Sequence, residues 1–224
     1  MIPGARLVLL GRQGAGKGTQ CVRLSRHYVV PHIATGDILR AAVREGTEFG
    51  RKARDYMNAG ELLPDDIIIG IIDERLERDD TRTRGYILDG FPRTVPQAEA
   101  LLEITSPRGI DLAVDLDVAL DVVLARLAGR RACSDCGANY SSAVPPKYDW
   151  TCDVCGGDVV QREDDTEEAI SQRLALYERE TAPLIAWFEE RNLMAVVDGL
   201  GHPDEVTDRL VREIDRRRTD AAHR

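Results

Sequence analysis

Residues 11–19 read Gly-Arg-Gln-Gly-Ala-Gly-Lys-Gly-Thr, and this glycine-rich stretch is the strongest indication of the fold in the sequence. It follows a short apolar run, Leu7 to Leu10, and it opens a helical pattern that extends from Lys17 to Tyr28. Glycines let the backbone wrap around an anion with its N–H groups pointing inward, and the start of a helix adds the positive end of a dipole. Lys17 has the spacing that allows a lysine to bridge the β- and γ-phosphates of a nucleotide. The order of strand, loop and helix therefore predicts a phosphate-binding loop.

The rest of the chain alternates between apolar runs of strand length and segments with helical periodicity. Further strands are expected at residues 86–88, 112–116 and 195–197, and helices at residues 38–57 (in pieces broken near Gly46 and Gly50), 67–76, 97–103, 119–127 and 167–191. The polar tail from Arg216 onward is expected to be frayed. Strands that alternate with helices predict the α/β fold class, with a doubly wound parallel sheet and helices on both faces.

Residues 132–161 interrupt this alternation with two consecutive prolines and four cysteines. The pairs Cys133-x-x-Cys136 and Cys152-x-x-Cys155 are separated by fifteen residues, a spacing typical of a four-thiolate zinc site. Such a site is structural, because four thiolates leave no open position for a substrate, and the metal can supply folding energy to a small insert. Two disulfides or an iron–sulfur cluster are the alternatives, and a reducing compartment favours zinc over disulfides. We expect a small β-rich unit that binds Zn²⁺.

The composition argues against several classes of function. The 224 residues suffice for one α/β domain with small insertions. The net charge of −9 argues against broad affinity for nucleic acid or anionic membranes. No run approaches the ~18 apolar residues of a membrane span, and residues 1–6 lack the features of a signal peptide. We expect a cytoplasmic protein without nucleic-acid or membrane partners.

Four segments, in order along the chain, resemble motifs of the adenylate kinase family. They are Gly16-Lys-Gly-Thr-Gln20, His32-Ile-Ala-Thr-Gly-Asp-Ile-Leu-Arg40, Asp89-Gly-Phe-Pro-Arg-Thr-Val-Pro-Gln97, and Arg162-Glu-Asp-Asp165 followed by Arg173. The similarity extends from residue 6 to residue 201, and the chain resembles the long-lid type, whose lid binds zinc through four cysteines. The resemblance implies reversible, Mg²⁺-dependent transfer of a phosphoryl group from ATP to AMP, which gives two molecules of ADP.

The same resemblance implies three parts with separate tasks. A core phosphate-loop domain would comprise residues 1–34, 64–129 and 163–224. A helical insertion that binds the nucleoside monophosphate would comprise residues 35–63, and the zinc-containing lid would comprise residues 130–162. Closure of the lid would exclude water, which could otherwise accept the phosphoryl group. Family members suggest a monomer whose ligands are ATP, AMP and ADP.

The resemblance also assigns a donor site to the phosphate loop, the lid and a glycine late in the chain. The expected ATP-binding residues are Gly14, Ala15, Gly16, Lys17, Gly18, Thr19, Arg130, Asn139, Tyr140 and Gly201. Gly18 stands where most phosphate loops place a Ser or Thr for Mg²⁺, so the metal is expected to be held largely through phosphates and water. Asp89, at the end of a strand, is the candidate that holds Mg²⁺ through water; a turn-forming role before Gly90 is the alternative.

The acceptor site follows from the same motifs. The expected AMP-binding residues are Thr35, Arg40, Glu61, Leu62, Leu63, Gly90, Phe91, Pro92, Arg93, Gln97, Arg162 and Arg173. Family members often carry a lysine at the position of Glu61, but backbone atoms supply the contact there, so little loss of function is expected. Gln97 offers an amide donor and acceptor to the edge of adenine.

Phosphoryl transfer requires in-line placement and neutralisation of the charge that spreads over the equatorial oxygens. Guanidinium groups suit this task because they bind phosphate in a bidentate manner and stay charged. The expected catalytic residues are Lys17, Arg93, Arg130, Arg162 and Arg173, and no general base is needed because the acceptor phosphate is already ionised. Asp164 and Asp165 are expected to help lock the lid, and Cys21 is expected to be a core thiol. Arg126 either packs against the adenine of the donor or is a surface residue.

Three other interpretations are open at this point. A kinase for UMP or CMP would have the same fold, although the long lid, Thr35 and Gln97 favour AMP. A zinc ribbon that recognises nucleic acid would belong to a different class, which the negative net charge disfavours. A nucleotide-dependent switch with slow hydrolysis would show negligible transfer to AMP.

Overall fold

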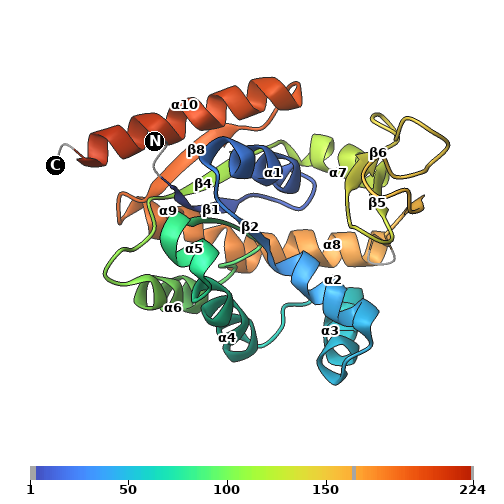
Figure 1. Cartoon of the computed structure of the whole chain (residues 1–224), viewed down its shortest axis with the longest axis horizontal. Coiled ribbons are helices and arrows are strands. Elements are labelled where there is room, and N and C mark those ends of the chain that lie inside the picture. Colours follow the sequence, from blue (N-terminus) through green and yellow to red (C-terminus); the bar gives the residue numbers. More distant parts are fainter. Residues whose placement is uncertain (1–3, 163–164, 223–224) are drawn as a thin grey trace.

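The computed structural model describes residues 4–162 and 165–222 of the chain. A five-stranded sheet forms its centre, with the strand order β2-β3-β1-β4-β8 (Figure 1). The strands are β1 (Arg6–Leu10), β2 (His32–Ala34), β3 (Tyr86–Asp89), β4 (Leu112–Asp117) and β8 (Met194–Asp198). All neighbouring pairs run parallel. The expected α/β class with a parallel central sheet is confirmed.

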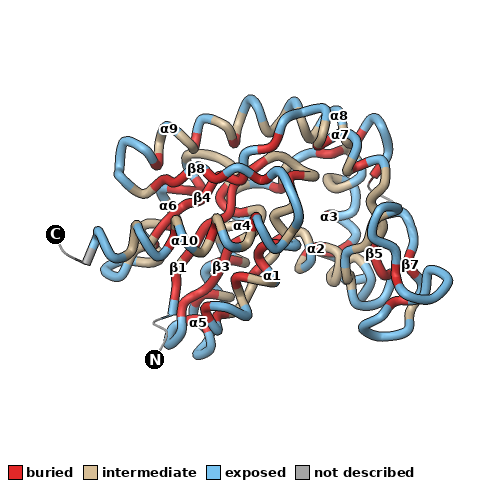
Figure 2. The backbone as a smooth tube through the Cα atoms, turned by 90° about the horizontal axis from the view of Figure 1, so that it is seen from above, coloured by how far each residue is buried: buried red, intermediate tan, exposed pale blue. Residues whose placement is uncertain are grey.

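Helices cover both faces of this sheet, and the alternation of side chains along β1 shows why. Leu7 and Leu9 belong to one buried cluster and Val8 and Leu10 to the other, because successive strand residues point to opposite faces. The first cluster is closed by α1 (Lys17–Tyr28), α7 (Leu120–Ala128) and α10 (Pro203–Ala222). The second is closed by α4 (Asp65–Leu76), α6 (Val95–Thr105) and α9 (Pro183–Glu189). Figure 2 shows the buried positions concentrated in the strands between these helices.

Two helices, α2 (Thr35–Glu45) and α3 (Glu48–Ala59), form a separate lobe with its own small core, which includes Leu39, Ala53 and Leu63. The expected break near Gly46 is confirmed, but the one near Gly50 is wrong, because Gly50 lies inside α3. A Cβ atom at Gly50 would lie 1.9 Å from the carbonyl oxygen of Ala42. Gly50 therefore permits close packing of α2 against α3 rather than a break in the helix.

The second sheet is small, antiparallel and separate from the first. It has the strand order β6-β5-β7, with β5 (Arg130–Cys133) in the centre between β6 (Asn139–Ser141) and β7 (Val159–Val160). Figures 1 and 2 both show this unit and the α2–α3 lobe at the same end of the molecule, away from the two termini. Most of its residues are exposed, as Figure 2 shows, and its hydrophobic core is small.

The helical segment expected at residues 167–191 is divided. It consists of α8 (Glu167–Leu176), a π-helical turn η1 (Tyr177–Thr181) and α9. Such turns occur frequently at functional sites, and here the hydroxyl of Thr181 donates a hydrogen bond of 2.9 Å to the carbonyl oxygen of Arg93. The short elements β2 and α5 (Asp79–Arg84) lie outside the segments for which periodicity predicted structure.

The prediction of a frayed tail from Arg216 is wrong for the described residues, because α10 continues to Ala222. Arg217 donates a hydrogen bond to the carbonyl oxygen of Met194 on β8, and Arg218 donates one of 2.7 Å to the carbonyl oxygen of Gly4. Arg218 also lies 3.4 Å from a carboxylate oxygen of Asp111. These bonds hold the last turns of the helix against the sheet. Within the described part of the chain, no helix combines the length and apolar character needed to cross a membrane.

Candidate active site

A cleft of about 1280 Å³ opens at the carboxyl ends of β1 and β3. The chain passes from β1 to β2 and β3 on one side and then to β4 and β8 on the other, so the loops that follow β1 and β3 diverge. Ligands of doubly wound sheets bind at such a switch point. The cleft exceeds the ~300–1000 Å³ that is usual for one drug-sized ligand, and it has room for two nucleotides.

The phosphate loop forms one wall of this cleft. Gly11, Gly14 and Gly16 adopt φ angles of 134°, 85° and 104°, which L side chains rarely adopt. A Cβ atom at Gly14 would also lie 2.8 Å from the side chain of Leu127 on α7. The N-cap of α1 is Gly16, which has no side-chain capping bond, and this leaves the helix start open to an anion.

Lys17 is the first residue of α1 and its ammonium group lies within the loop. Nζ donates hydrogen bonds to the carbonyl oxygens of Gly11 (2.7 Å) and Arg12 (3.0 Å). Burial lowers the pKa of Lys17 below its ordinary value, although the negative charge of Asp89 opposes this shift. A bound polyphosphate would supply the anionic partner that favours the charged form.

Arg126 on α7 is a residue for which the sequence left two roles open, packing against a nucleotide base or exposure at the surface. One guanidinium nitrogen donates to the carbonyl oxygen of Ala15 in the phosphate loop (2.9 Å), and the other donates to that of Gly199 after β8 (3.2 Å). Arg126 therefore joins the phosphate loop to the segment that precedes α10. Its position one helical turn before Arg130 indicated that it lies near the cleft. Its two carbonyl partners could not be predicted, because they lie 111 and 73 residues away in sequence.

The opposite wall is built by the start of α2 and the turn after β3. The hydroxyl of Thr35 donates to the carbonyl oxygen of Gly90 (3.0 Å), and Nε of Arg93 donates to the same oxygen (2.8 Å). A Cβ atom at Gly90, whose φ is 82°, would lie 2.6 Å from the Thr35 hydroxyl oxygen. Only glycine fits this turn without displacing Thr35. Arg40, one turn along α2, forms an ion pair with Asp37.

Gln97 is almost fully buried, at 2% exposure, and both ends of its amide are engaged. Oε1 accepts a hydrogen bond from the backbone N–H of Arg93 (2.8 Å), and Nε2 donates one to Oδ1 of Asp65 (2.6 Å). Oδ2 of Asp65 accepts a further bond from the hydroxyl of Thr94 (3.2 Å). Asp65 and the backbone N–H of Arg93 together fix which end of the amide is donor and which is acceptor. Sequence reasoning missed Asp65, because it lies 32 residues before Gln97.

Asp165 forms ion pairs with two of the arginines that were expected to be catalytic. Its side chain is 1% exposed and accepts hydrogen bonds from Nε (2.7 Å) and Nη2 of Arg130, while Nη1 of Arg173 lies 3.9 Å from Oδ1. Arg173 also donates a 2.7 Å hydrogen bond from Nη2 to the carbonyl oxygen of Met57 at the end of α3. The two arginines therefore connect the small sheet, α8 and the α2–α3 lobe. Asp164 lies outside the described residues.

Asp89 ends β3 on the floor of the cleft, between the two walls. A Cβ atom at Gly18 would lie 3.8 Å from Oδ2 of Asp89, so the carboxylate is close to the phosphate loop. Burial opposes ionisation, but neighbouring His32 and Lys17 hold the pKa of Asp89 below its ordinary value. An ionised carboxylate beside a phosphate loop fits Mg²⁺, which prefers oxygen ligands and keeps several waters.

The small sheet covers the phosphate loop. A Cβ atom at Gly18 would lie 3.5 Å from the side-chain amide nitrogen of Asn139 on β6, so this side chain reaches the phosphate loop. Tyr140 also lines the cleft, but its hydroxyl is directed to the cysteines. That hydroxyl lies 3.4 Å from Sγ of Cys152 and accepts a 2.8 Å hydrogen bond from the backbone N–H of Asp153.

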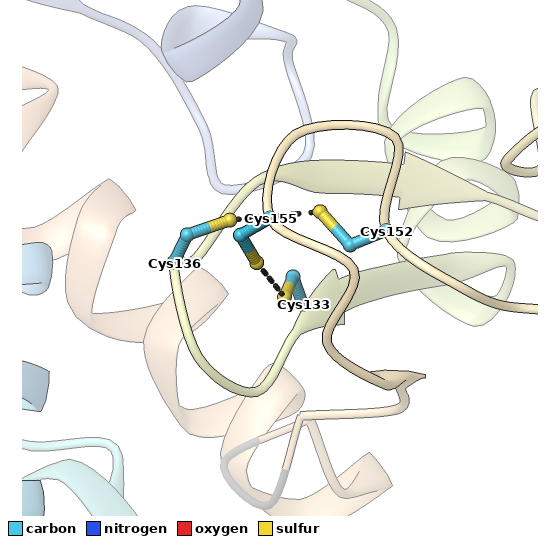
Figure 3. A group of neighbouring side chains, drawn as sticks. All are labelled: Cys133, Cys136, Cys152 and Cys155. Atoms are coloured by element: carbon cyan, nitrogen blue, oxygen red, sulfur yellow. Dashed lines mark hydrogen bonds between the residues drawn. The ribbon is translucent and has the colours of Figure 1, made fainter.

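The four paired cysteines converge, as Figure 3 shows. Sγ of Cys133 lies 3.5 Å from Sγ of Cys155, and Sγ of Cys136 lies 3.6 Å from Sγ of Cys152. All four thiols are free, so neither pair is a disulfide. Four sulfurs around a tetrahedral Zn²⁺, each at about 2.3 Å from the metal, would lie about 3.8 Å apart. The cysteines thus have nearly the spacing that a four-thiolate zinc site requires.

The cleft brings together nearly all residues that the sequence assigned to two nucleotides. It is lined by every expected donor residue, including Gly201, and by every expected acceptor residue except Phe91. The ring of Phe91 is fully buried in the core beneath α4 and α6, so any contact of this residue with a nucleotide would come from its backbone. Leu63 lines the cleft although most of its side chain is buried in the α2–α3 lobe.

A phosphate loop at the switch point of a parallel sheet, faced by arginines on the opposite wall, defines an α/β protein of the phosphate-loop class that binds phosphate esters. A family model described as "Adenylate kinase" matches residues 9–193. Adenylate kinases from a Geobacter species and from Methanococcoides burtonii are 52% and 47% identical to this chain over 203 and 212 residues. These alignments cover 89% and 93% of this chain and 94% and 98% of the relatives. The chain therefore belongs to the adenylate kinase family.

Proposed function

We propose that the protein transfers the γ-phosphoryl group of ATP to AMP, reversibly and with Mg²⁺, and so forms two molecules of ADP. One observation carries this proposal. A single cleft has a phosphate loop on one wall and the Thr35–Gly90–Arg93–Gln97 group on the other, with Arg130, Arg162 and Arg173 in its lining. Membership of the adenylate kinase family supports a phosphotransferase that acts on nucleoside monophosphates.

The chemistry required of the residues is placement and charge neutralisation. The loop amides and Lys17 would hold the β- and γ-phosphates of ATP, and Arg40 and Arg93 would hold the phosphate of AMP. Arg130 and Arg173 are now paired with Asp165, and transfer of these guanidinium groups to phosphate oxygens would exchange one anionic partner for another. Mg²⁺, when bound, neutralises phosphate charge, and Asp89 is the residue that would hold it through water.

The mode of adenine recognition follows from the amide of Gln97. After its bonds to Arg93 and Asp65, the amide retains one N–H donor and one lone pair of its oxygen, because an amide nitrogen carries two hydrogens and a carbonyl oxygen two lone pairs. The base edge of AMP offers the matching partners, an amino group and a ring nitrogen. Uracil and hypoxanthine present a carbonyl oxygen and an N–H, which is the reverse pattern.

Asp65→Asn is expected to raise the KM for AMP about tenfold, because one well-oriented hydrogen bond contributes roughly 1–1.5 kcal/mol. The kcat should change little, since Asp65 does not touch the phosphates. Discrimination between AMP and IMP should fall, because an asparagine amide can pair with either end of Gln97 and leaves the backbone N–H of Arg93 as the one bond of this pair that orients it. Steady-state kinetics with both acceptors measures this, and the exposed neighbour Asp66→Asn is the matched control. Unchanged discrimination in Asp65→Asn would contradict the assignment.

The direct test of the function compares acceptors. A coupled assay of ADP formation with ATP, Mg²⁺ and either AMP, UMP or CMP should show AMP as the best substrate. Hydrolysis of ATP without acceptor should be negligible, because the lid excludes water. If UMP or CMP is phosphorylated at least as well as AMP, the assignment of the acceptor is wrong. If ATP is hydrolysed while AMP is not phosphorylated, the protein is a hydrolytic switch instead.

For the lid we propose a structural Zn²⁺ held by Cys133, Cys136, Cys152 and Cys155. The four sulfurs fit a tetrahedral metal, and the unit has too little core of its own to fold without support. The hydroxyl of Tyr140 supports such a site, since its hydrogen bond lowers the pKa of Cys152 to about 6. We also propose that residues 130–162 act as the lid, residues 35–63 as the monophosphate-binding lobe, and residues 1–34, 64–129 and 163–224 as the core.

Metal analysis of the purified protein should find about one zinc per chain, and chelation should lower thermal stability more than it lowers activity in the cold. A loss of about 3 kcal/mol corresponds to a decrease in Tm of roughly 6–12 °C in a chain of this size. Cys155→Ser should reproduce the decrease, whereas Ser134→Ala, in the same unit, should not. Metal-free protein with an unchanged Tm would contradict a structural role.

The proposal includes nucleotides as the only partners, in keeping with the net charge of −9. We propose a monomer, as the resemblance to the adenylate kinase family suggests. We place the protein in the cytoplasm, where free thiols and a thiolate zinc site persist.

A further inference from the structure

A second group of potential metal ligands lies in the floor of the cleft, apart from the lid cysteines. It consists of Cys21 on α1, His32 at the start of β2 and Asp89 at the end of β3. One ligand atom from each residue lies within 4.8 Å of the other two. The function proposed above uses Asp89 but neither Cys21 nor His32.

The ring nitrogen Nε2 of His32 is buried and, as far as the structure describes the chain, unsatisfied. Nε2 of His32 is inaccessible to solvent and makes no hydrogen bond with the described residues. It lies 3.5 Å from Oδ2 of Asp89, which is at the limit of hydrogen bonding. An unsatisfied buried imidazole nitrogen needs an explanation, and a bound ion is one, because imidazole, carboxylate and thiolate groups are all metal ligands.

The spacing of the three groups fits zinc. Tetrahedral Zn²⁺ binds sulfur at about 2.3 Å and nitrogen or oxygen at about 2.0–2.2 Å, which places neighbouring ligand atoms about 3.3–3.6 Å apart. The His32–Asp89 pair already has this separation, and the Cys21 thiol would have to move by at most about 1.5 Å, because it lies within 4.8 Å of both other ligand atoms. Three protein ligands leave a fourth position open, as in accessible zinc sites.

The chemistry of the ligands favours a borderline cation over Mg²⁺. Mg²⁺ prefers oxygen ligands, whereas a thiolate and an imidazole select Zn²⁺. His32 and Asp89 line the cleft and provide a route of entry, and Cys21 is fully buried directly behind them. Lys17 and Arg93 are nearby positive charges that oppose a cation. Asp89 and a Cys21 thiolate together offset the two charges of Zn²⁺, and Nζ of Lys17 is bonded to two loop carbonyl oxygens.

We propose that Cys21, His32 and Asp89 form a second, inhibitory Zn²⁺ site in the floor of the cleft. Zinc bound there occupies Asp89 and so withdraws the carboxylate that would hold the water shell of Mg²⁺. Binding of the second zinc is independent of the function proposed above, whereas the inhibition rests on it.

The test uses the full chain with its lid metal in place and counts zinc by equilibrium dialysis against an excess of added Zn²⁺, without nucleotide; the second zinc is the one bound beyond the single ion expected in the purified protein. Wild-type protein should bind about two zinc ions per chain, and the variants Cys21→Ala and His32→Gln should each bind about one. Co²⁺ in place of the second zinc should give wild-type protein a thiolate-to-metal absorption band that Cys21→Ala lacks. Retention of the lid zinc and an unchanged Tm would show that the variants are folded. A single zinc in wild-type protein, or two in Cys21→Ala, would overturn the site.

The second measurement is ADP formation at saturating Mg²⁺, with free zinc set by a metal buffer. The zinc concentration for half inhibition should be at least about tenfold higher in Cys21→Ala than in wild-type protein, because loss of a ligand weakens a metal site by more than loss of an outer contact does. Without zinc, the two proteins should have equal rates. Equal zinc sensitivity would overturn the inhibitory role, whereas absence of ADP formation in wild-type protein that carries only the lid zinc would instead overturn the proposed function.

Discussion

Lys17→Ala is expected to abolish ADP formation from ATP and AMP almost completely, with a decrease in kcat on the order of 10³ or more. The ammonium group lies inside the turn formed by residues 11–19, where the carbonyl oxygens of Gly11 and Arg12 hold it. During transfer it would neutralise charge between the β- and γ-phosphates. Alanine leaves the loop amides in place but removes that charge.

The control for this change is Lys52→Ala. Lys52 lies on α3 and forms an exposed ion pair of 3.1 Å with Glu48, so its loss should leave kcat unaltered. Lys17→Ala should also keep a Tm near that of wild-type protein, because burial disfavours the charged form of this lysine. Turnover at the wild-type rate in Lys17→Ala would contradict the assignment of the phosphate loop.

Arg93→Ala is expected to lower kcat by a factor on the order of 10²–10³ and to weaken AMP binding as well. The guanidinium group is held at the cleft by a 2.8 Å bond from its Nε to the carbonyl oxygen of Gly90, while the backbone of Arg93 is fixed by Gln97 and Thr181. This rigid placement presents the remaining guanidinium nitrogens to phosphate oxygens. Arg93→Lys should be impaired too, because an ammonium group retains the charge but not the planar fork.

Steady-state and single-turnover kinetics at saturating AMP separate the two effects of Arg93→Ala. Arg216→Ala is the matched control, since Arg216 lies on α10 in exposed ion pairs with Glu213 and Asp220. A charge-stabilising donor should cause a large loss of kcat when it is removed. If the kcat of Arg93→Ala stays within about threefold of that of wild-type protein, Arg93 does not touch the transferred group.

The features that were predictable from sequence are those fixed by neighbours in the chain. The phosphate loop needs a strand before it and a helix after it, and all three are continuous from Arg6 to Tyr28. The cysteine pairs are likewise local, because each Cys-x-x-Cys turn has its own spacing. It was predictable that the two pairs form one cluster, because four thiolates at this spacing complete the tetrahedral coordination of one metal ion.

The features that were not predictable depend on contacts between distant segments. Asp65 and Gln97 become partners only when the start of α4 packs beside α6. Arg126 joins two loops that come together only because β1, β4 and β8 are neighbours in the sheet. The prediction of a break at Gly50 was wrong for a related reason. A glycine is needed there because Ala42 of another helix approaches closely, and sequence alone does not show that contact. The last turns of α10 were mistaken for a frayed tail because Arg217 and Arg218 find their partners on β8 and near residue 4.

We propose that one cleft holds two nucleotides end to end, with their phosphates between the two walls. A crystal structure with AMP and a non-hydrolysable ATP analogue would show both ligands and their contacts. We predict the triphosphate within the turn of residues 11–19 and the AMP phosphate in contact with Arg40 and Arg93. An AMP phosphate remote from these two arginines, or a phosphate loop without nucleotide, would contradict the account.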